Sequence, residues 1–390
     1  MQRRRLLTSG AGLIAAAVAG CIGGDDDEAS EGSEGAGTGN EEETGAGDGD
    51  GGTPYEVTVE PAGTHTFEEV PETYATIPGA WMDLSMAFGI QPEGLAYLER
   101  HPTKFYDQLP GVEFDEEEVV IFGDGESARS YDKEVFYEMD ADVHLMDPRM
   151  LQEYSGWSDE DVAEIEGNVA PYLGSQIRFD FDGQEPYYTM YEALERNAEV
   201  FQRQEQYEAW VDLHEEFIAD VEAELPPEDE RPSVAVFWRG LDADAGEFNP
   251  APIHEKRNDT QSYRDLGLVD AFEGQHVDGP VGYETLLEIE PDYLSALNLS
   301  SMTGEEWQTE VVEPLENHST ASELQAVQNG NVVRAAGQFM GPIVHLFSTE
   351  ALAKQVFPDR FGEWPGDSEA IPDGEQLFDR ERVADIVNGV

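Results

Sequence analysis

Short apolar runs alternate with helical patterns along most of this chain. Each run is bounded by Gly, Pro, Asn or Asp, as expected for buried strands. The predicted strands are 74–78, 94–98, 119–122, 143–146, 233–238, 293–297 and 332–335. The predicted helices are 80–88, 131–139, 283–289 and 342–356. This alternation is typical of parallel sheets built from βα units, so the predicted fold class is α/β with two doubly wound lobes.

The longest helical pattern lies between the two halves. Apolar residues recur every three or four positions from Tyr191 to Phe201 and again from Trp210 to Val221, with acids and glutamines between them. One helix over 191–224 would span about 50 Å at 1.5 Å per residue. The alternative is two helices with a joint near 202–206. Either connection is stiff and permits only a modest hinge.

This pattern divides the folded part of the chain. We predict a first α/β lobe over 54–186, a linking helix over 187–226 and a second α/β lobe over 227–390. The chain is long enough for each lobe to have its own core.

The N-terminus has the features of an export signal. A basic start is followed by a short apolar stretch and a small-residue cleavage site, which is too short for a spanning helix. The segment RRRLL at 3–7 resembles a twin-arginine signal, and VAGC at 18–21 resembles a lipobox, whose cysteine becomes lipidated. The alternative is a Sec-type signal with a chance cysteine, but Cys21 is the only cysteine. We predict removal of residues 1–20 and a lipid anchor on Cys21, on the extracytoplasmic face of the cell membrane.

The segment that follows the cysteine has no means of forming a core. Residues 22–53 are almost all Gly, Asp, Glu, Ser, Thr, Ala and Asn. Such a composition buries too little apolar surface to offset the entropy of ordering, and its like charges repel one another. We therefore predict a disordered acidic tether over 21–53.

The charge of the chain is strongly one-sided. It has 21 Lys and Arg against 85 Asp and Glu, a net charge of −64. Such a surface repels nucleic-acid phosphates, so we expect no nucleic-acid partner. The acids are spread along the chain rather than clustered, which argues against the alternative of cation storage. The composition is similar to that of proteins from halophilic archaea, where about 1 M salt shortens the Debye length to about 3 Å.

One motif occurs twice. Residues 134–142 and 284–292 share the pattern Glu-x-φ-φ-Glu-φ-acid-x-Asp, where φ is apolar, and a predicted strand follows each copy. A repeat of this length predicts two duplicated lobes. The alternative is two unrelated amphipathic helices in an acidic protein.

The same motif resembles a signature of the iron-siderophore and cobalamin class of substrate-binding proteins of ABC importers. Pro291 fits the family pattern, whereas Ala141 replaces the proline of the first copy. Further matches are TIPGAW at 76–81, YRDLG at 263–267, AVQNGNVV at 326–333 and FPDRF at 357–361. The resemblance implies two α/β lobes joined by one long helix, a ligand cleft between the lobes, and delivery of a metal chelate to a permease dimer and its ATPase subunits.

Motifs of enzymes are missing from the sequence. It has no Gly-x-Ser-x-Gly, no phosphate loop ending in Lys-Ser/Thr and no His-Glu-x-x-His, and its eight histidines show no paired metal spacing. We therefore predict a binding protein with no cofactor and no metal site. The alternatives are an exported chelatase-like or hydrolytic enzyme on a doubly wound scaffold, and a cell-surface interaction module without a small ligand.

Basic residues are scarce, yet three arginines closely follow predicted strands: Arg129, Arg149 and Arg239. Ligands of open α/β sheets meet these loops, and guanidinium groups suit carboxylates. We therefore expect an anionic chelate, such as a carboxylate siderophore complex or a tetrapyrrole, with Trp81 and Trp238 as flat walls. The alternatives are that Arg149 pairs with Asp147 and that either tryptophan belongs to the core.

The resemblance also implies a docking pair. In the family, the first Glu of each lobe's motif meets an arginine of the permease, and the matching residues are Glu134 and Glu284. The alternative is that both are ordinary solvated acids, in which case Glu138 and Glu288 would serve equally.

Overall fold

The computed structural model describes residues 53–390, except 124–130, 179–180, 182, 239, 255, 276–278, 300 and 338. The predicted signal, the lipidation site Cys21 and nearly all of the tether lie outside the described residues, as do Arg129 and Arg239.

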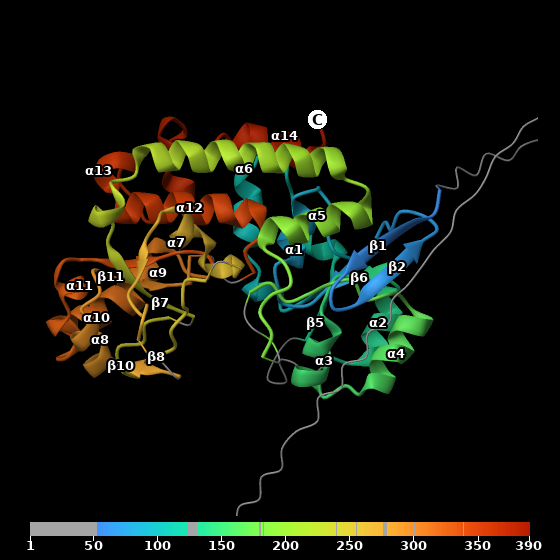
Figure 1. The fold of residues 1–390 in the computed structure, drawn as a ribbon, viewed down its shortest axis with the longest axis horizontal. Coiled ribbons are helices and arrows are strands. Elements are labelled where there is room, and N and C mark those ends of the chain that lie inside the picture. The colour runs from blue at the N-terminus through green and yellow to red at the C-terminus, as the bar shows by residue number, and fades with distance from the viewer. Residues whose placement is uncertain are drawn as a thin grey trace, which may run out of the picture. The chain divides into compact units, whose positions relative to one another are not determined.

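The first lobe is built on a parallel four-stranded sheet in the order β5-β4-β3-β6, whose outer strands β5 and β6 are labelled in Figure 1. Its strands are β3 (Tyr74–Thr76), β4 (Gly94–Ala96), β5 (Val120–Phe122) and β6 (Val143–His144). Its helices are α1 (Trp81–Met86), α2 (Lys133–Met139), α3 (Pro148–Ser155) and α4 (Asp159–Asn168). An antiparallel hairpin of β1 (Tyr55–Val59) and β2 (Gly63–Phe67) precedes the sheet.

The second lobe has a parallel sheet in the order β12-β11-β7-β9. Its strands are β7 (Ser233–Phe237), β9 (Val269–Asp270), β11 (Tyr293–Ala296) and β12 (Val332–Arg334). The strands β8 (Glu247–Phe248) and β10 (Val281–Gly282) form a separate antiparallel pair. The helices after β7 are α7 (Gln261–Asp265), α8 (Tyr283–Ile289), α9 (Gly304–Trp307), α10 (Glu313–Asn317), α11 (Gln325–Gln328), α12 (Pro342–Val356), α13 (Pro358–Phe361) and α14 (Arg380–Asn388).

These two sheets confirm the predicted α/β class with two lobes. Every predicted strand and helix has a counterpart, and α8 and α12 have the predicted bounds. The hairpin β1–β2, helices α3, α4, α9, α10, α11, α13 and α14, and strands β8, β9 and β10 were not predicted. Each of those last three strands is two residues long, too short to show a periodic pattern.

The helical pattern between the lobes forms two helices, as in the second alternative. Helix α5 (Met190–Phe201) begins at a capping box of Thr189 and Glu192, and it ends at Gln202, whose φ is 53°. A left-handed residue of this kind interrupts the helical hydrogen bonding. Helix α6 (Gln204–Glu224) then leads to β7, so it makes the long connection between the lobes.

The predicted repeat is also a structural repeat. Helices α2 and α8 each span seven residues, and each ends at a left-handed residue, Asp140 or Glu290. Two residues later, Asp142 accepts hydrogen bonds from the backbone N and Oγ1 of Thr73, both at 3.0 Å. Asp292 accepts the same pair from Ser233, both at 2.8 Å. Each lobe therefore uses one aspartate to fix the start of its central strand.

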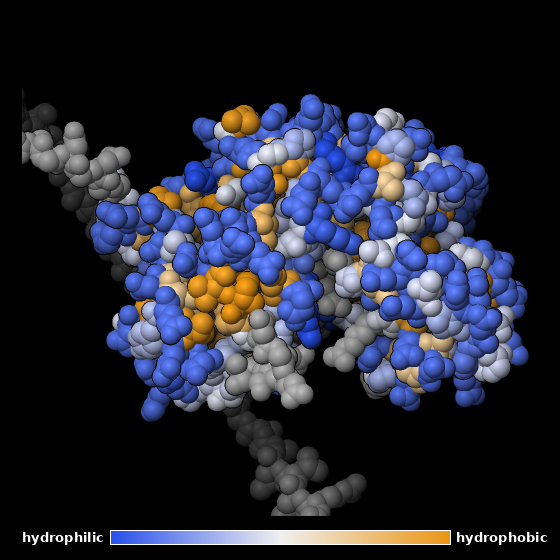
Figure 2. All heavy atoms as spheres, turned by 180° about the vertical axis from the view of Figure 1, so that it is seen from behind, coloured by the Kyte–Doolittle hydropathy of each residue, from blue (hydrophilic) through white to orange (hydrophobic). Residues whose placement is uncertain are grey.

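One hydrophobic core joins the two lobes. Leu84 of α1, Trp210 of α6 and Phe347 of α12 belong to the same buried cluster. Trp210 also donates a hydrogen bond from Nε1 to the carbonyl of Ala87 at 2.7 Å. Outside this core the surface is mostly hydrophilic on the face shown in Figure 2, as the acidic composition leads us to expect.

Candidate functional site

A pocket lies at the carboxyl ends of the strands of the first lobe. It is lined by Ile77, Pro78, Tyr97, Arg100, Tyr131, Met150, Tyr154, Gln176, Arg178 and Phe339. Ile77 and Pro78 follow β3, whereas Met150 and Tyr154 come from α3, which follows β6. The strand order reverses between β3 and β6, which is the point where open α/β sheets bind ligands.

The lining is basic and aromatic. It contains two arginines and three tyrosines, and none of its described residues is an acid. The Arg100 guanidinium lies 5.1 Å from the centre of the Tyr97 ring, and the rings of Tyr97 and Tyr131 are 6.2 Å apart in an edge-to-face arrangement. In a chain with 85 acidic residues, this lining favours an anionic ligand.

Arg178 connects the pocket to the second lobe. Its guanidinium carbon lies 4.8 Å from the ring centre of Trp238 and 5.5 Å from that of Phe339. Its Nε is 3.6 Å from a carboxylate oxygen of Asp259, and its side chain is 17% exposed. A ligand that binds Arg178 would therefore contact a side chain that also packs against residues of the second lobe.

The partner of Arg178 is a buried carboxylate. Burial raises the pKa of Asp259 to about 7, and the charge of Arg178, followed by those of Arg257 and Arg264, acts in the opposite direction. Burial also lowers the pKa of Arg178, against the charge of Asp259. A buried charge is stable only when it is paired, so the two groups depend on each other.

Phe339 is the residue of the second lobe that reaches the lining. Its φ is 62°, an uncommon conformation for a non-glycine residue. Its ring stacks on that of His101, with centres 5.1 Å apart. Burial lowers the pKa of His101 to about 4, so this wall is neutral at physiological pH.

The pocket is small in this arrangement of the lobes. Its volume is about 80 Å³, whereas sites for small organic ligands usually measure about 300–1,000 Å³. A ligand of siderophore size therefore requires Phe339 and Arg178 to move apart from the side chains of α3 and Arg100.

The lobes are held together away from the pocket by a second buried carboxylate. Asp83 of α1 accepts hydrogen bonds from the backbone N of Gly341 at 2.8 Å and of Val344 at 3.1 Å, at the start of α12. Burial raises the pKa of Asp83 to about 7, although these amide hydrogen bonds favour the charged form. The N-terminus of a helix also favours a negative charge.

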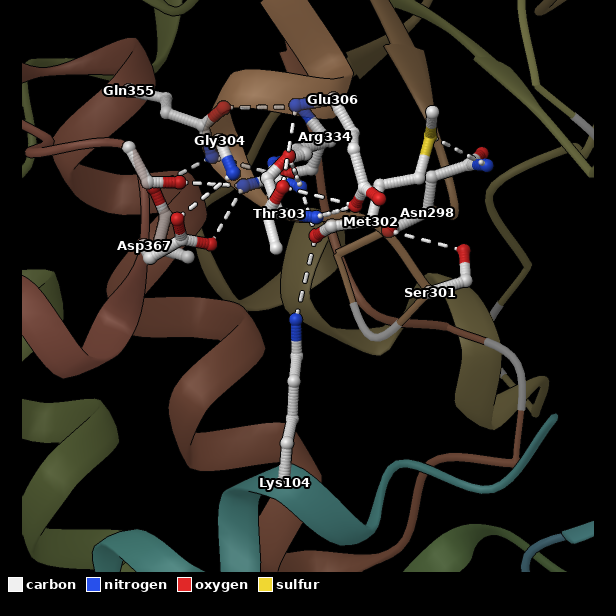
Figure 3. A network of polar contacts seen from close by, with 12 residues as sticks. Lys104, Asn298, Ser301, Met302, Thr303, Gly304, Glu306, Arg334, Gln355 and Asp367 are labelled. Carbon is white, nitrogen blue, oxygen red and sulfur yellow. Dashed lines mark hydrogen bonds and ion pairs between the residues drawn. The ribbon is translucent and has the colours of Figure 1, made fainter. Parts of the chain in front are cut away.

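An arginine network stabilises the second lobe near the same interface (Figure 3). The buried Arg334 donates to the carbonyls of Met302, Thr303 and Gly366. It also pairs with Asp367 at 3.1 Å. Lys104 of the first lobe donates to the same Met302 carbonyl at 3.4 Å, so this network also contacts the first lobe.

The structure places the two tryptophans that were predicted to line the ligand site in different surroundings. Trp238 packs against Arg178, a lining residue, but is not itself among the described residues of the lining. Trp81 is 3% exposed, and it donates from Nε1 to the carbonyl of Ser175 at 2.8 Å. Trp81 is thus placed in the core and is not among the side chains that line the pocket.

Arg149 lies beside the pocket rather than on its lining. Its Nη2 is 2.6 Å from Oδ2 of Asp147, and its Nε is 3.0 Å from Oδ1. The guanidinium carbon also lies 5.2 Å from the ring centre of Phe181. This is the pairing with Asp147 that the sequence left open as an alternative.

The sequence did not point to Arg100 or Arg178. Arg178 lies in a stretch between α4 and α5 without a periodic pattern, so no predicted strand directed attention to it. For Arg100 a signal was available but overlooked, because Arg100 follows the predicted strand 94–98 by two residues. For Arg178 the available signal was the scarcity of basic residues, of which the chain has 21.

Comparison with known proteins gives the family. A family model described as "Periplasmic binding protein" matches residues 132–338. This family consists of solute-binding proteins rather than enzymes, in agreement with the lack of catalytic motifs. No curated protein matches the chain. Across the described part of residues 53–390, no helix has the length and apolar character needed to cross a bilayer.

Solved structures share the fold at low sequence identity. CeuE of Helicobacter pylori with Ni(II) bound has a TM-score of 0.57 at 10% identity, covering 86% of this chain and 96% of its own. The petrobactin-binding protein YclQ of Bacillus subtilis has a TM-score of 0.56 at 14% identity, covering 78% and 99%. The catecholate-siderophore binding protein VctP of Vibrio cholerae has a TM-score of 0.52 at 13% identity, covering 78% and 99%. The chain has two parallel sheets, and its pocket lies at the switch point of the sheet of the first lobe. Since the family model matches more than half of its length, this chain belongs to the periplasmic binding protein family.

Proposed function

We propose that this protein is the solute receptor of an ABC importer and that it captures an anionic metal chelate of the siderophore type. The observation that carries the proposal is the pocket lining, which offers Arg100 and Arg178 and no acid among its described residues. Elsewhere acids outnumber bases about fourfold. A negatively charged ligand is therefore attracted to this pocket and repelled by most of the remaining surface.

The chemistry of the lining fits such a chelate. Guanidinium groups form strong charge-assisted hydrogen bonds with carboxylates and other oxyanions. The rings of Tyr97, Tyr131 and Tyr154 offer flat apolar surface together with hydroxyl groups. Among the proteins with this fold, YclQ is described as binding petrobactin and VctP as binding catecholate siderophores, which supports the same ligand class here.

We also propose that the receptor works outside the cell while tethered to the membrane. The sequence at 3–7 and 18–21 supports export and lipidation of Cys21, and the acidic segment 21–53 supports a flexible spacer. The net charge of −64 supports a surface adapted to high salt, where self-repulsion is screened. Replacement of Cys21 by Ser should release the protein into the medium or leave it uncleaved. Fractionation of the cleaved variant with membranes, as for the parent, would contradict lipidation.

The permease partner is proposed to dock at Glu134 and Glu284. Both side chains are exposed, each in the first turn of its seven-residue helix, α2 or α8. The two helices occupy equivalent positions in the structural repeat, so they offer one carboxylate per lobe to a two-subunit permease.

The test begins with protein purified from its native host. Absorbance spectra and mass spectrometry should reveal a coloured chelate that copurifies. Stripped protein should then be titrated, following tryptophan fluorescence, with ferric complexes of a carboxylate siderophore and of an uncharged hydroxamate siderophore. Tighter binding of the anionic complex, without turnover, is the expected result.

Two variants make the titration specific. Arg100→Gln removes an exposed charge from the lining and should weaken binding of the anionic complex about 10- to 100-fold, the usual value of a hydrogen bond to a charged group. Arg382→Gln is the matched control because Arg382 pairs with Glu216 outside the pocket. Equal affinities of the two variants and the parent, or chemical conversion of the chelate, would contradict the proposal.

A further inference from the structure

Three side chains from three helices meet at a position that the cargo pocket does not include. They are His214 of α6, Asp265 at the end of α7 and His345 of α12. One possible ligand atom from each lies within 4.8 Å of the other two. The Nε2 of His345 is 2.6 Å from Oδ2 of Asp265, and the ring centres of the two histidines are 5.2 Å apart.

Each of the two imidazoles has a buried ring nitrogen without a hydrogen-bond partner among the described residues. His345 is fully buried, at 0% exposure, and its Nδ1 has no hydrogen-bond partner among the described residues. The same holds for Nε2 of His214, which is also buried. Leaving a buried polar atom unpaired costs about 1–3 kcal/mol. His345 faces Asp265 with its Nε2, so the unpaired nitrogen that an ion beside this carboxylate would satisfy is Nε2 of His214, and it indicates that a component of the site is missing.

We propose that His214, Asp265 and His345 bind one divalent transition-metal ion, with Zn²⁺ as the best match. Two imidazole nitrogens and one carboxylate oxygen form a common set of three protein ligands for zinc, with a fourth position open to water. Hard ions such as Mg²⁺ prefer sites made only of oxygen ligands, so the two histidines select against them.

The donors are close to the spacing that the ion requires. With bonds of about 2.0–2.1 Å in a tetrahedron, ligand atoms lie about 3.3 Å apart. His345 and Asp265 need to separate slightly from their 2.6 Å contact, while His214 rotates inward. The ion then replaces the hydrogen bond between them. Thr349 Oγ1 lies 3.2 Å from the same Nε2 of His345, so it gives up this contact when the ion binds there.

The location gives the ion a structural effect. Helix α6 connects the lobes, whereas α7 and α12 belong to the second lobe. An ion bound by all three helices fixes α6 to the second lobe. None of its three ligands lines the cargo pocket, so occupancy by the ion and by the chelate can be measured separately.

The experiment uses the mature protein after treatment with a chelator. It is titrated with Zn²⁺ in excess Mg²⁺, which occupies weak carboxylate sites on this acidic surface, and bound zinc is counted by elemental analysis. We expect one Zn²⁺ per chain and an increase in Tm, because an ion that binds only the folded state stabilises it. Substitution with Co²⁺ should give the visible absorption of a four-coordinate site.

Variants identify the ligands. His214→Ala, at a half-buried position, should weaken zinc binding by more than about 100-fold, beyond the 10- to 100-fold loss typical of outer partners, and should abolish the increase in Tm. His65→Ala is the control, since His65 lies on β2 outside the cluster. Asp265→Asn provides a second variant should His345→Gln fail to fold.

The proposal is overturned by either of two results. One is the absence of stoichiometric zinc binding by the parent protein in excess Mg²⁺. The other is equal zinc affinity of His214→Ala, Asp265→Asn and His65→Ala. Neither result affects the chelate titration, so the metal site and the cargo pocket are tested independently.

Discussion

The first and second lobes place the same structural motif at the same point of their sheets, yet they contribute very differently to the pocket. Asp142 binds Thr73, just before β3, and Asp292 binds Ser233, the first residue of β7, through matching pairs of hydrogen bonds. The pocket, in contrast, takes Phe339 alone from the described residues of the second lobe. The two lobes thus share a framework, whereas the loops that follow their strands differ.

The two lobes also hold their interface with different chemistry. Asp83 of the first lobe accepts hydrogen bonds from backbone amides of α12, which any sequence could supply. Asp259 of the second lobe faces the side chain of Arg178, which also lines the pocket. The first contact joins the lobes irrespective of ligand, whereas the second links the lobe interface to the ligand site.

The largest effect is expected from Arg178→Gln. Without the guanidinium, the buried carboxylate of Asp259 loses a positive charge that stabilises its ionised form. The free energy of unfolding at pH 8 should therefore fall by about 3–5 kcal/mol. Chemical denaturation measures this change. Adding Asp259→Asn should restore part of the lost stability, whereas additive losses would show that the two groups do not depend on each other.

The same substitution distinguishes the arginine of the pocket from its neighbour. Arg178→Gln in the Asp259→Asn background should weaken binding of the anionic chelate about 100-fold or more. Arg149→Gln should have a smaller effect, because Arg149 pairs with Asp147 beside the pocket. Equal losses of chelate affinity would show that Arg149 also contacts the ligand, as predicted from the sequence.

The next effect is a pH dependence due to Asp83. Its pKa is raised from 3.8 to about 7 by burial, so between these values the folded protein keeps a proton that the unfolded chain has lost. Stability from this group therefore falls as pH rises from about 4 to about 7 and is constant above. Relative to the parent, Asp83→Asn should gain up to about 4 kcal/mol over that range, at 1.36 kcal/mol per pKa unit.

Denaturation of the parent and of Asp83→Asn at pH 4.5 and pH 8 provides the measurement. Asp107→Asn, on an exposed position, controls for the general effect of removing one charge from an acidic protein. A stability difference that does not change with pH would contradict the assignment.

A smaller effect tests the shared framework. Asp142→Ala and Asp292→Ala each remove hydrogen bonds to the start of a central strand. Both aspartates are exposed, so we expect a loss of about 1–2 kcal/mol in each case. Similar losses of stability in thermal unfolding would support the equivalence of the two lobes. A loss of stability in only one of the two variants would contradict it.

The smallest effect on the isolated protein is expected from Glu134→Lys combined with Glu284→Lys. Exposed charges contribute about 0–1 kcal/mol to stability, and neither residue lines the pocket. Tm and chelate affinity should therefore be unchanged, while cellular uptake should be blocked by repulsion from the permease. Glu138→Lys with Glu288→Lys is the matched control, and normal uptake by the first pair would remove the docking role.

Much of the fold could be predicted because its elements are local. Helix α8 follows from its apolar spacing, and α12 follows from its apolar run and the proline at its start. The hairpin β1–β2 was missed although YEVTV alternates polar residues with the buried Val57 and Val59, because its partner strand GTHTF is largely polar. The break between α5 and α6 occurs at Gln202, without a glycine or proline to mark it.

The sequence by itself determined the features that depend on nearby residues. These are the types of most elements, the repeated motif of each lobe, the acidic surface and the signal-like N-terminus. Periodicity, helix ends and charge are properties of short segments, so they can be read before the chain is folded.

Only the tertiary structure decided which residues meet. Sheet order and the path between α4 and α5 bring Arg178 to Trp238 and Asp259, and they place Trp81 in the core. Helix packing brings His214 to His345 across more than a hundred residues of sequence. No local pattern records such contacts, because they depend on how separate elements pack around a common core.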